Sequence, residues 1–176
     1  MFSDPVKNLK AFDLRDDMTV ADLGAGTGSY AIAAAEMVPR GKVYAVEIQR
    51  DFLTAVKNKA EEARLRNLEC LLGDVEKIGG TKIRDESMDA VIASNVLFQL
   101  DDKDKFVEEI KRILKPNGRV LLVDWSSDQS SIMSGSKRVV TENQATELFN
   151  RYGFSLLRKI NAGEHHYGII FLKNKN

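Results

Sequence analysis

The stretch Val20–Gly28 reads VADLGAGTG and joins a short apolar run to three glycines at alternate positions. A carboxylate, Asp22, lies near the end of the apolar run, and Gly24, Gly26 and Gly28 follow it. Glycine adopts backbone conformations that other residues avoid, and it lets a ligand approach the main chain closely. The stretch therefore predicts a strand that ends in a glycine-rich, ligand-binding turn. A tight strand-to-helix turn without a ligand is the alternative.

The spacing of these glycines differs from that of a dinucleotide site. The dinucleotide fingerprint, G-x-G-x-x-G, requires its third glycine one position after Gly28. That position holds Ser29, so the pattern here is G-x-G-x-G. An NAD-dependent dehydrogenase is therefore a secondary alternative.

Apolar runs that are typical of buried strands alternate along the chain with segments of helical periodicity. We expect strands at residues 19–23, 42–48, 68–72, 88–94 and 119–125, a turn at 116–118, and helices from Pro5 (capped by Ser3 or Asp4) and at 29–38, 51–63, 103–114 and 141–152. Five strands separated by helices predict a parallel sheet covered on both faces. Two further strands, 154–160 and 167–172, are only six residues apart, so they should be antiparallel.

The composition bounds the class of protein. A length of 176 residues fits one domain, expected over residues 1–176. The 26 basic and 26 acidic side chains balance, so net charge predicts no DNA or membrane partner. No run reaches the ~18 apolar residues of a membrane span, and the N-terminus lacks a signal-peptide core, so a cytoplasmic protein is expected. The one cysteine, Cys70, is expected to be a buried structural thiol.

Two carboxylates follow neighbouring strands. Asp22 lies in an apolar strand, where an unpaired carboxylate is costly and a cationic ligand would relieve that cost. Glu47 closes the strand KVYAVEI, 19 positions after Gly28. A carboxylate at that strand end can accept two hydrogen bonds from the hydroxyls of a ribose. A solvated residue at the start of a loop is the alternative for Glu47.

The next strand ends in Gly73-Asp74-Val75. The Asp74 carboxylate can accept a hydrogen bond from an exocyclic amine, and the Val75 amide can donate to a ring nitrogen. This pair would recognise the edge of an adenine, and Ile48 is placed to lie on the face of the base. An ordinary turn or helix-cap aspartate is the alternative for Asp74.

A ribose, an adenine and a cationic group together are the parts of S-adenosylmethionine, and here a resemblance to a family becomes clear. The chain resembles the class I S-adenosylmethionine-dependent methyltransferases. The matching segments are DLGAGTG at 22–28, Glu47, GDV at 73–75, MDAVIASNVL at 88–97 and LKPNGRVLLVDW at 114–125. Residues 100–126 resemble the ubiquinone/menaquinone-biosynthesis branch and its small-molecule relatives.

The resemblance implies an α/β, three-layer Rossmann-like fold whose seven-stranded sheet is parallel except for its last strand. It also implies S-adenosylmethionine as the methyl donor. The methionine part would lie against Gly24, Ala25 and Gly26, with Asp22 orienting its ammonium group through water. Asn95 ends the fourth strand and would lie next to the transferred methyl group; a plain turn residue is the alternative.

Methyl transfer from a sulfonium to a small-molecule acceptor is a direct displacement, in which alignment supplies much of the rate and a general base is optional. Candidate groups near the acceptor are Tyr30, Asn95, Asp124, His165 and His166. Asp124 can equally cap the loop that follows it. The two histidines are expected to be a solvated turn pair, with a proton acceptor or a metal ligand as alternatives.

Absent motifs narrow the choice of acceptor. The chain has SNVL where amino-methylating DNA enzymes have two prolines, and it lacks the Pro-Cys of cytosine C5 enzymes and the several cysteines of arsenite methylation. Residues 1–12 and 126–140 are expected to cover the substrate only thinly, which suits a small substrate, a second copy of the chain or a protein partner. A non-catalytic protein or partner subunit that binds S-adenosylmethionine or S-adenosylhomocysteine is the main alternative.

Overall fold

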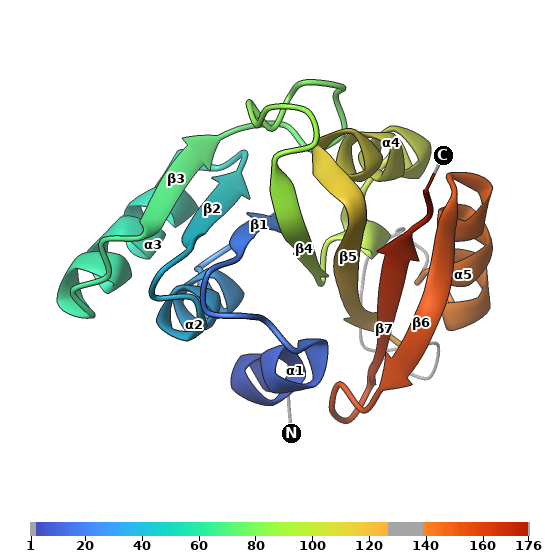
Figure 1. Ribbon diagram of the computed structural model, residues 1–176, viewed down its shortest axis with the longest axis horizontal. Helices are drawn as coiled ribbons and strands as arrows, with labels where there is room; N and C mark the ends of the chain where they lie inside the picture. Colours follow the sequence, from blue (N-terminus) through green and yellow to red (C-terminus); the bar gives the residue numbers. More distant parts are fainter. Residues whose placement is uncertain (1–2, 127–138, 176) are drawn as a thin grey trace.

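The computed structural model describes residues 3–126 and 139–175, and these form one seven-stranded sheet flanked by helices (Figure 1). The strands are β1 (Thr19–Leu23), β2 (Lys42–Glu47), β3 (Leu68–Leu72), β4 (Met88–Ser94), β5 (Leu114–Trp125), β6 (Phe154–Ile160) and β7 (His166–Lys173). Their order is β3-β2-β1-β4-β5-β7-β6. Strand β7 runs antiparallel to both neighbours and the other pairs are parallel, which confirms the predicted fold class.

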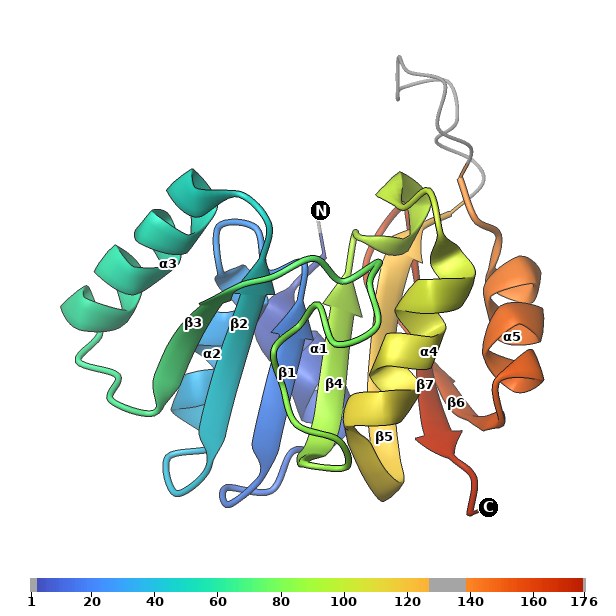
Figure 2. The same ribbon diagram turned by 90° about the horizontal axis from the view of Figure 1, so that it is seen from above.

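The helices cover the two faces of the sheet. They are α1 (Pro5–Phe12), α2 (Ser29–Met37), α3 (Arg50–Glu62), α4 (Lys103–Ile113) and α5 (Glu142–Arg151), with a short 3-10 helix, η1, at Leu97–Gln99. Figure 2 shows α4 in front of the sheet and α1 and α2 behind it. Two buried apolar clusters match this division: one joins the sheet to α4 and α5, and the other joins it to α1, α2 and α3.

Local sequence explains where several helices begin. The Asp4 carboxylate accepts from the Lys7 amide in front of α1, and the Asp102 carboxylate accepts from the Lys105 amide in front of α4. Helix α5 starts with a capping box, in which Thr141 and Gln144 satisfy each other's backbone amides. These caps fix the helix starts within a residue or two of the predicted positions.

The prediction that residues 116–118 form a turn before the fifth strand is wrong, because these residues lie inside that strand. Strand β5 already begins at Leu114, and its register against β4 shifts between Met88 and Ala90. Asn117 has a φ of 62°, a left-handed conformation that asparagine tolerates. The turn-forming residues therefore produce an irregularity inside a longer strand.

The expectation that Cys70 is buried is also wrong, since its side chain is only half-buried. Strand β3 lies at the edge of the sheet, so Cys70 is paired with Ala45 of β2 on one side only. Partial burial still raises the pKa of the thiol.

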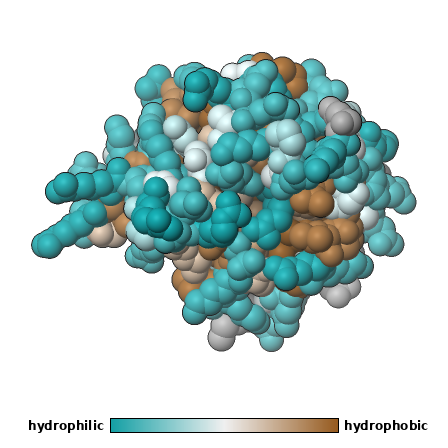
Figure 3. Space-filling view, in the orientation of Figure 1, coloured by the Kyte–Doolittle hydropathy of each residue, from teal (hydrophilic) through white to brown (hydrophobic). Residues whose placement is uncertain are grey.

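The surface seen in Figure 3 is largely hydrophilic, with apolar groups over the β6–β7 end of the sheet. Strand β6 exposes Leu156 and Leu157. Across residues 3–126 and 139–175, no helix has both the length and the apolar character needed to span a membrane. Most of the predicted cover at 126–140 lies outside the described residues.

Candidate functional site

A cavity of about 590 Å³ lies at the edge of the sheet where strands β1 to β5 end. The predicted site residues that line it are Asp22, Gly24, Ala25, Gly26, Glu47, Ile48, Gly73, Asp74, Val75 and Asn95. The parallel strands bring these residues together because their carboxyl ends share one edge of the sheet. Gly28 is not among the lining residues.

The three glycines of the first turn all have positive φ values, but they serve different purposes. A Cβ atom on Gly24 would lie 2.7 Å from Val96 Cγ2, and one on Gly28 would lie 2.8 Å from Val56 Cγ2. Both glycines therefore allow close packing of the turn against its neighbours. A Cβ atom on Gly26 would meet nothing within 4 Å. The backbone at Gly26 is thus the part of the turn that is open to a ligand.

Asp22 is a buried carboxylate with one oxygen that lacks a hydrogen-bond partner among the residues the structure describes. Its side chain belongs to the interior, with 2% of the residue exposed, and Oδ2 has no hydrogen-bond partner within the described chain. Burial raises the pKa of Asp22 to about 7 although the Ala31 amide donates to the carboxylate, and the nearby charge of Glu47 adds to the rise. A cation that enters the cavity would stabilise the ionised form of Asp22.

Glu47 is held in place by the main chain. Its Oε2 atom accepts a hydrogen bond from the Gly26 amide at 2.9 Å, and Oε1 accepts from the amides of Ile48 (2.9 Å) and Gln49 (3.0 Å). Each carboxylate oxygen has two lone pairs, so Oε1 is fully used and Oε2 keeps one free acceptor position. The fixed carboxylate is therefore suited to a hydroxyl donor that approaches Oε2.

The third predicted segment forms the neighbouring wall. Asp74 Oδ1 accepts from the Glu76 amide at 3.0 Å, and Oδ2 pairs with the Lys77 ammonium at 3.0 Å. These contacts lower the pKa of Asp74, with the Lys77 interaction making the largest contribution. Ile48 is 61% exposed at the cavity, which leaves an apolar surface available for a flat ring.

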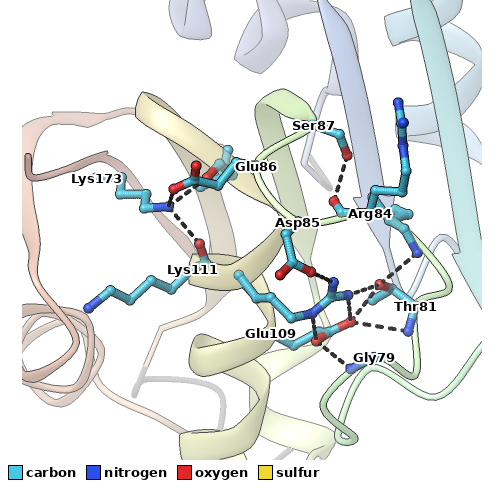
Figure 4. Close-up of polar contacts among 12 residues, drawn as sticks. Gly79, Thr81, Arg84, Asp85, Glu86, Ser87, Glu109, Lys111 and Lys173 are labelled. Atoms are coloured by element: carbon cyan, nitrogen blue, oxygen red, sulfur yellow. Dashed lines mark hydrogen bonds and ion pairs between the residues drawn. The ribbon is translucent and has the colours of Figure 1, made fainter.

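A buried ion pair supports the loop that carries Asp74. Figure 4 shows Glu109 of α4 pointing toward Gly79 and Thr81, which belong to the connection between β3 and β4. Glu109 is fully buried and accepts from the Gly79 amide (2.8 Å), the Thr81 amide (3.2 Å) and the Thr81 hydroxyl (2.5 Å). Arg112 donates two further bonds to it, and these bonds outweigh burial and lower the pKa of Glu109. The loop is also joined to the cavity, because Gly80 accepts from the Asp74 amide.

The opposite end of the cavity contains groups that sequence reasoning placed wrongly or missed. His166 is 9% exposed, so the prediction of a solvated pair is wrong for this residue; His165 is exposed. Strand β7 begins at His166 and aligns it with Trp125 of β5, with ring centroids 4.3 Å apart. Strand β7 is buried along almost its whole length, so the signal for this burial was its continuous apolar run, extended by one residue toward the N-terminus.

His166 also contacts Asn95. Nδ1 of the ring lies 3.1 Å from the Glu164 carbonyl oxygen, and Nε2 lies 3.0 Å from Asn95 Oδ1. These distances show that His166 and Asn95 form a hydrogen-bonded pair. Within the described residues, no group of three His, Cys, Asp or Glu side chains is arranged to hold a metal ion.

The remaining candidates differ in their access to the cavity. Asp124 does not line it: its carboxylate accepts from the amides of Phe98 (3.2 Å) and Trp125 (2.8 Å), and burial raises its pKa to about 6. Tyr30 does line it, and its hydroxyl bonds with Ser3 Oγ at 2.7 Å and Asn8 Nδ2 at 2.8 Å. Ser3 also lines the cavity and belongs to the N-terminal segment that was expected to cover the substrate, although the sequence did not single out this residue.

Comparison with known proteins agrees with this geometry. A family model described as a methyltransferase domain matches residues 14–166. The ubiquinone/menaquinone biosynthesis C-methyltransferase UbiE of Pasteurella multocida is 30% identical over 152 residues, which cover 84% of this chain and 50% of that protein. An arsenite methyltransferase of Halobacterium salinarum is 32% identical over 119 residues, which cover 66% of this chain and 30% of that protein. The chain thus spans about half or less of the length of these two relatives.

A solved structure shows the same architecture. The S-adenosylmethionine-dependent methyltransferase of Aquifex aeolicus superposes with a TM-score of 0.86 at 28% identity, covering 98% of this chain and 90% of that one. The sequence match, the strand order and the cavity at the strand ends all agree with one family. The chain belongs to the class I S-adenosylmethionine-dependent methyltransferases, in the branch that includes the ubiquinone and menaquinone biosynthesis enzymes.

Proposed function

We propose that this chain transfers a methyl group from S-adenosylmethionine to a small-molecule acceptor by direct displacement. The observation that carries the proposal is the buried Asp22 carboxylate, whose Oδ2 atom has no partner in the described part of the chain and which lines the same cavity as the amide-anchored Glu47. A molecule with a cationic group at one place and a pair of hydroxyls at another satisfies both. The family to which the chain belongs uses such a molecule.

The residues present fit this donor. Asp22 would hold the ammonium group, and the open backbone at Gly26, with Gly24 and Ala25, would lie against the methionine part. When bound, S-adenosylmethionine supplies a methyl group activated by its sulfonium sulfur.

The nucleoside part fits the next two strand ends. Glu47 would accept from the ribose hydroxyls at the position on Oε2 that remains free. Asp74 would accept from the adenine amine, Val75 would donate its amide to a ring nitrogen, and Ile48 would cover the face of the base. Gly73 keeps this wall close-packed, because a Cβ atom there would lie 2.6 Å from the Gly80 carbonyl oxygen.

The chain would accelerate the reaction mainly by alignment. A direct displacement needs the nucleophile in line with the methyl carbon and the sulfur, and holding two reactants in such a geometry can lower a barrier by several kcal/mol, up to about 11. Asn95, Trp125 and His166 line the end of the cavity beyond the turn, where an acceptor would approach. No ionisable side chain is required as a base for this step.

The acceptor and the organisation of the whole protein are also part of the proposal. We infer that residues 1–176 act as one donor-binding domain and that the acceptor is a small organic molecule, as the name of the UbiE relative suggests. Incubating the protein with labelled methyl donor and a small-molecule extract, followed by identification of the labelled product, tests this. Labelling of protein only, or of nothing, contradicts it.

Replacing Glu47 with alanine should weaken binding of S-adenosylhomocysteine by about 1–3 kcal/mol, the range for losing hydrogen bonds to a charged group. Calorimetry measures this loss directly. Glu69→Ala is the matched control, because Glu69 lies on the neighbouring strand β3, is exposed and pairs with Lys42 away from the cavity. An unchanged affinity in Glu47→Ala would reject the ribose assignment.

A further inference from the structure

The pair formed by His166 and Asn95 carries information about the acceptor that the family resemblance does not supply. His166 is fixed on one side, because its Nδ1 atom lies 3.1 Å from the carbonyl oxygen of Glu164. A carbonyl oxygen can only accept a hydrogen bond, so Nδ1 must carry the proton and donate. The tautomer of the ring is thereby determined.

The other ring nitrogen then has no proton to donate while the ring is neutral. Burial and the neighbouring charge of His165 lower the pKa of His166 below its ordinary value despite the hydrogen bond to Glu164, and this lowering favours the neutral ring. Nε2 is consequently a hydrogen-bond acceptor. Its partner, at the Asn95 Oδ1 position 3.0 Å away, has to be a donor.

The side-chain amide of Asn95 can supply this donor by rotating about its Cβ–Cγ bond, so that Nδ2 and Oδ1 exchange positions. Its oxygen and nitrogen ends have the same shape, and the hydrogen-bond network decides which end faces a given partner. The backbone of Asn95 is already fixed: its amide donates to the Val123 carbonyl at 2.8 Å, and its carbonyl accepts from Gln99 at 2.7 Å. His166 is therefore the group that orients the Asn95 side chain.

We propose that His166 is a positioning residue that makes Asn95 donate its amino group to the ring and present its carbonyl oxygen to the cavity, so that the site selects an acceptor whose nucleophilic atom carries a hydrogen. Such an acceptor is a hydroxyl compound or a primary or secondary amine, since O–H and N–H groups can donate to that oxygen. As the new O–C or N–C bond forms, the S–C bond to the methyl group breaks, S-adenosylhomocysteine leaves as the neutral thioether, and the acceptor's proton passes to solvent water. The Trp125 ring, which lines the cavity beside His166, provides a flat surface for a ring-shaped acceptor. This inference rests on the proposed function.

The tautomer can be tested without any variant. The chain has only two histidines, so nitrogen-15 NMR of histidine-labelled protein gives two rings, and a His165→Asn variant assigns them. In the protein without ligand at pH 8, we expect His166 to be protonated at Nδ1 and bare at Nε2. A ring protonated at Nε2, or at both nitrogens, overturns the proposal.

The selectivity is tested with matched probes on the protein saturated with S-adenosylhomocysteine. Phenol and aniline should bind more tightly than anisole and N,N-dimethylaniline, by roughly threefold to tenfold, as expected for one neutral hydrogen bond. His166→Phe should remove this preference while retaining affinity for S-adenosylhomocysteine, and His165→Asn should retain both. Equal binding within the pairs, or no binding of phenol and aniline, contradicts the inference. If S-adenosylhomocysteine itself does not bind, that result contradicts the proposed function instead. The tautomer measurement then still tests the hydrogen bond between His166 and Asn95.

Discussion

Replacing Asp22 with asparagine is expected to stabilise the protein without ligand at pH 8 and to weaken its binding of S-adenosylhomocysteine. The ionised Asp22 carboxylate is buried with an unpaired oxygen, and burial raises its pKa from 3.8 to about 7. A shift of this size costs the folded state up to about 4 kcal/mol when the carboxylate is ionised. A buried amide carries its own desolvation cost of about 1–3 kcal/mol, so we expect a net gain of about 2 kcal/mol.

The sign of the pH dependence distinguishes this explanation from a packing effect. Between about pH 4 and pH 7 the unfolded state has lost the Asp22 proton while the folded state retains it. The contribution of Asp22 to the free energy of unfolding therefore decreases as pH rises through this window and is constant above it. The advantage of Asp22→Asn should accordingly be small at pH 5 and largest at pH 8.

Chemical denaturation of both proteins at pH 5 and pH 8 measures this difference, and calorimetry measures the accompanying loss of affinity. We expect S-adenosylhomocysteine to bind about 1.5–3 kcal/mol more weakly to the variant, because a hydrogen bond to a charged group is lost. Asp101→Asn, on an exposed residue away from the cavity, is the control. If the variant is less stable at pH 8, or if the difference in stability between the two proteins does not depend on pH, then burial of the ionised Asp22 carboxylate does not destabilise the folded protein.

Replacing Glu109 with alanine should destabilise the protein by about 3–5 kcal/mol, the cost of removing one partner of a buried ion pair. The substitution leaves the amides of Gly79 and Thr81 without their acceptor, and it leaves the Arg112 guanidinium with Asp85 as its remaining carboxylate partner. The lower end of this range is expected, because Arg112 keeps 19% of its side chain exposed to water. The loop that carries Asp74 should loosen as well, which would weaken binding of S-adenosylhomocysteine.

Urea denaturation measures the loss of stability. The slope of unfolding free energy against urea concentration should be the same in the variant and in the unmodified protein. Glu108→Ala is a matched control on the same helix, since Glu108 is exposed and differs from Glu109 mainly in burial. A loss below 1 kcal/mol in Glu109→Ala, or an equal loss in the control, would mean that the buried pair contributes little to the fold.

The sequence predicted the framework of the fold because local patterns determine it. Apolar runs and helix caps placed the strands and helices, and the six-residue gap predicted the antiparallel pairing of β6 with β7, whereas the antiparallel place of the last strand in the sheet came from the family resemblance. Glu109 shows where this reasoning fails. Residues 103–114 carry apolar side chains on one side of the predicted helix and charged side chains on the other, so Glu109 was expected on the exposed side, yet it is fully buried. Its partners Gly79 and Thr81 lie about 30 positions earlier, and no local pattern reveals them.

The sequence also predicted only part of the candidate site. The carboxylates Asp22 and Glu47 follow from their positions at the ends of apolar strands, and the structure places both at one cavity. The different purposes of Gly24 and Gly26 depend on what packs against each one, which only the tertiary structure shows. His166 was misplaced because a pair of histidines after Gly163-Glu164 resembles a turn, whereas strand β7 already begins at His166.

The central claim is that the cavity at the strand ends binds an adenosyl sulfonium or its demethylated product. Isothermal calorimetry of the unmodified protein with S-adenosylhomocysteine, and separately with NAD, tests it most directly. The account predicts saturable one-to-one binding of S-adenosylhomocysteine and no binding of NAD. Absence of heat with S-adenosylhomocysteine, or preferential binding of NAD, would contradict it.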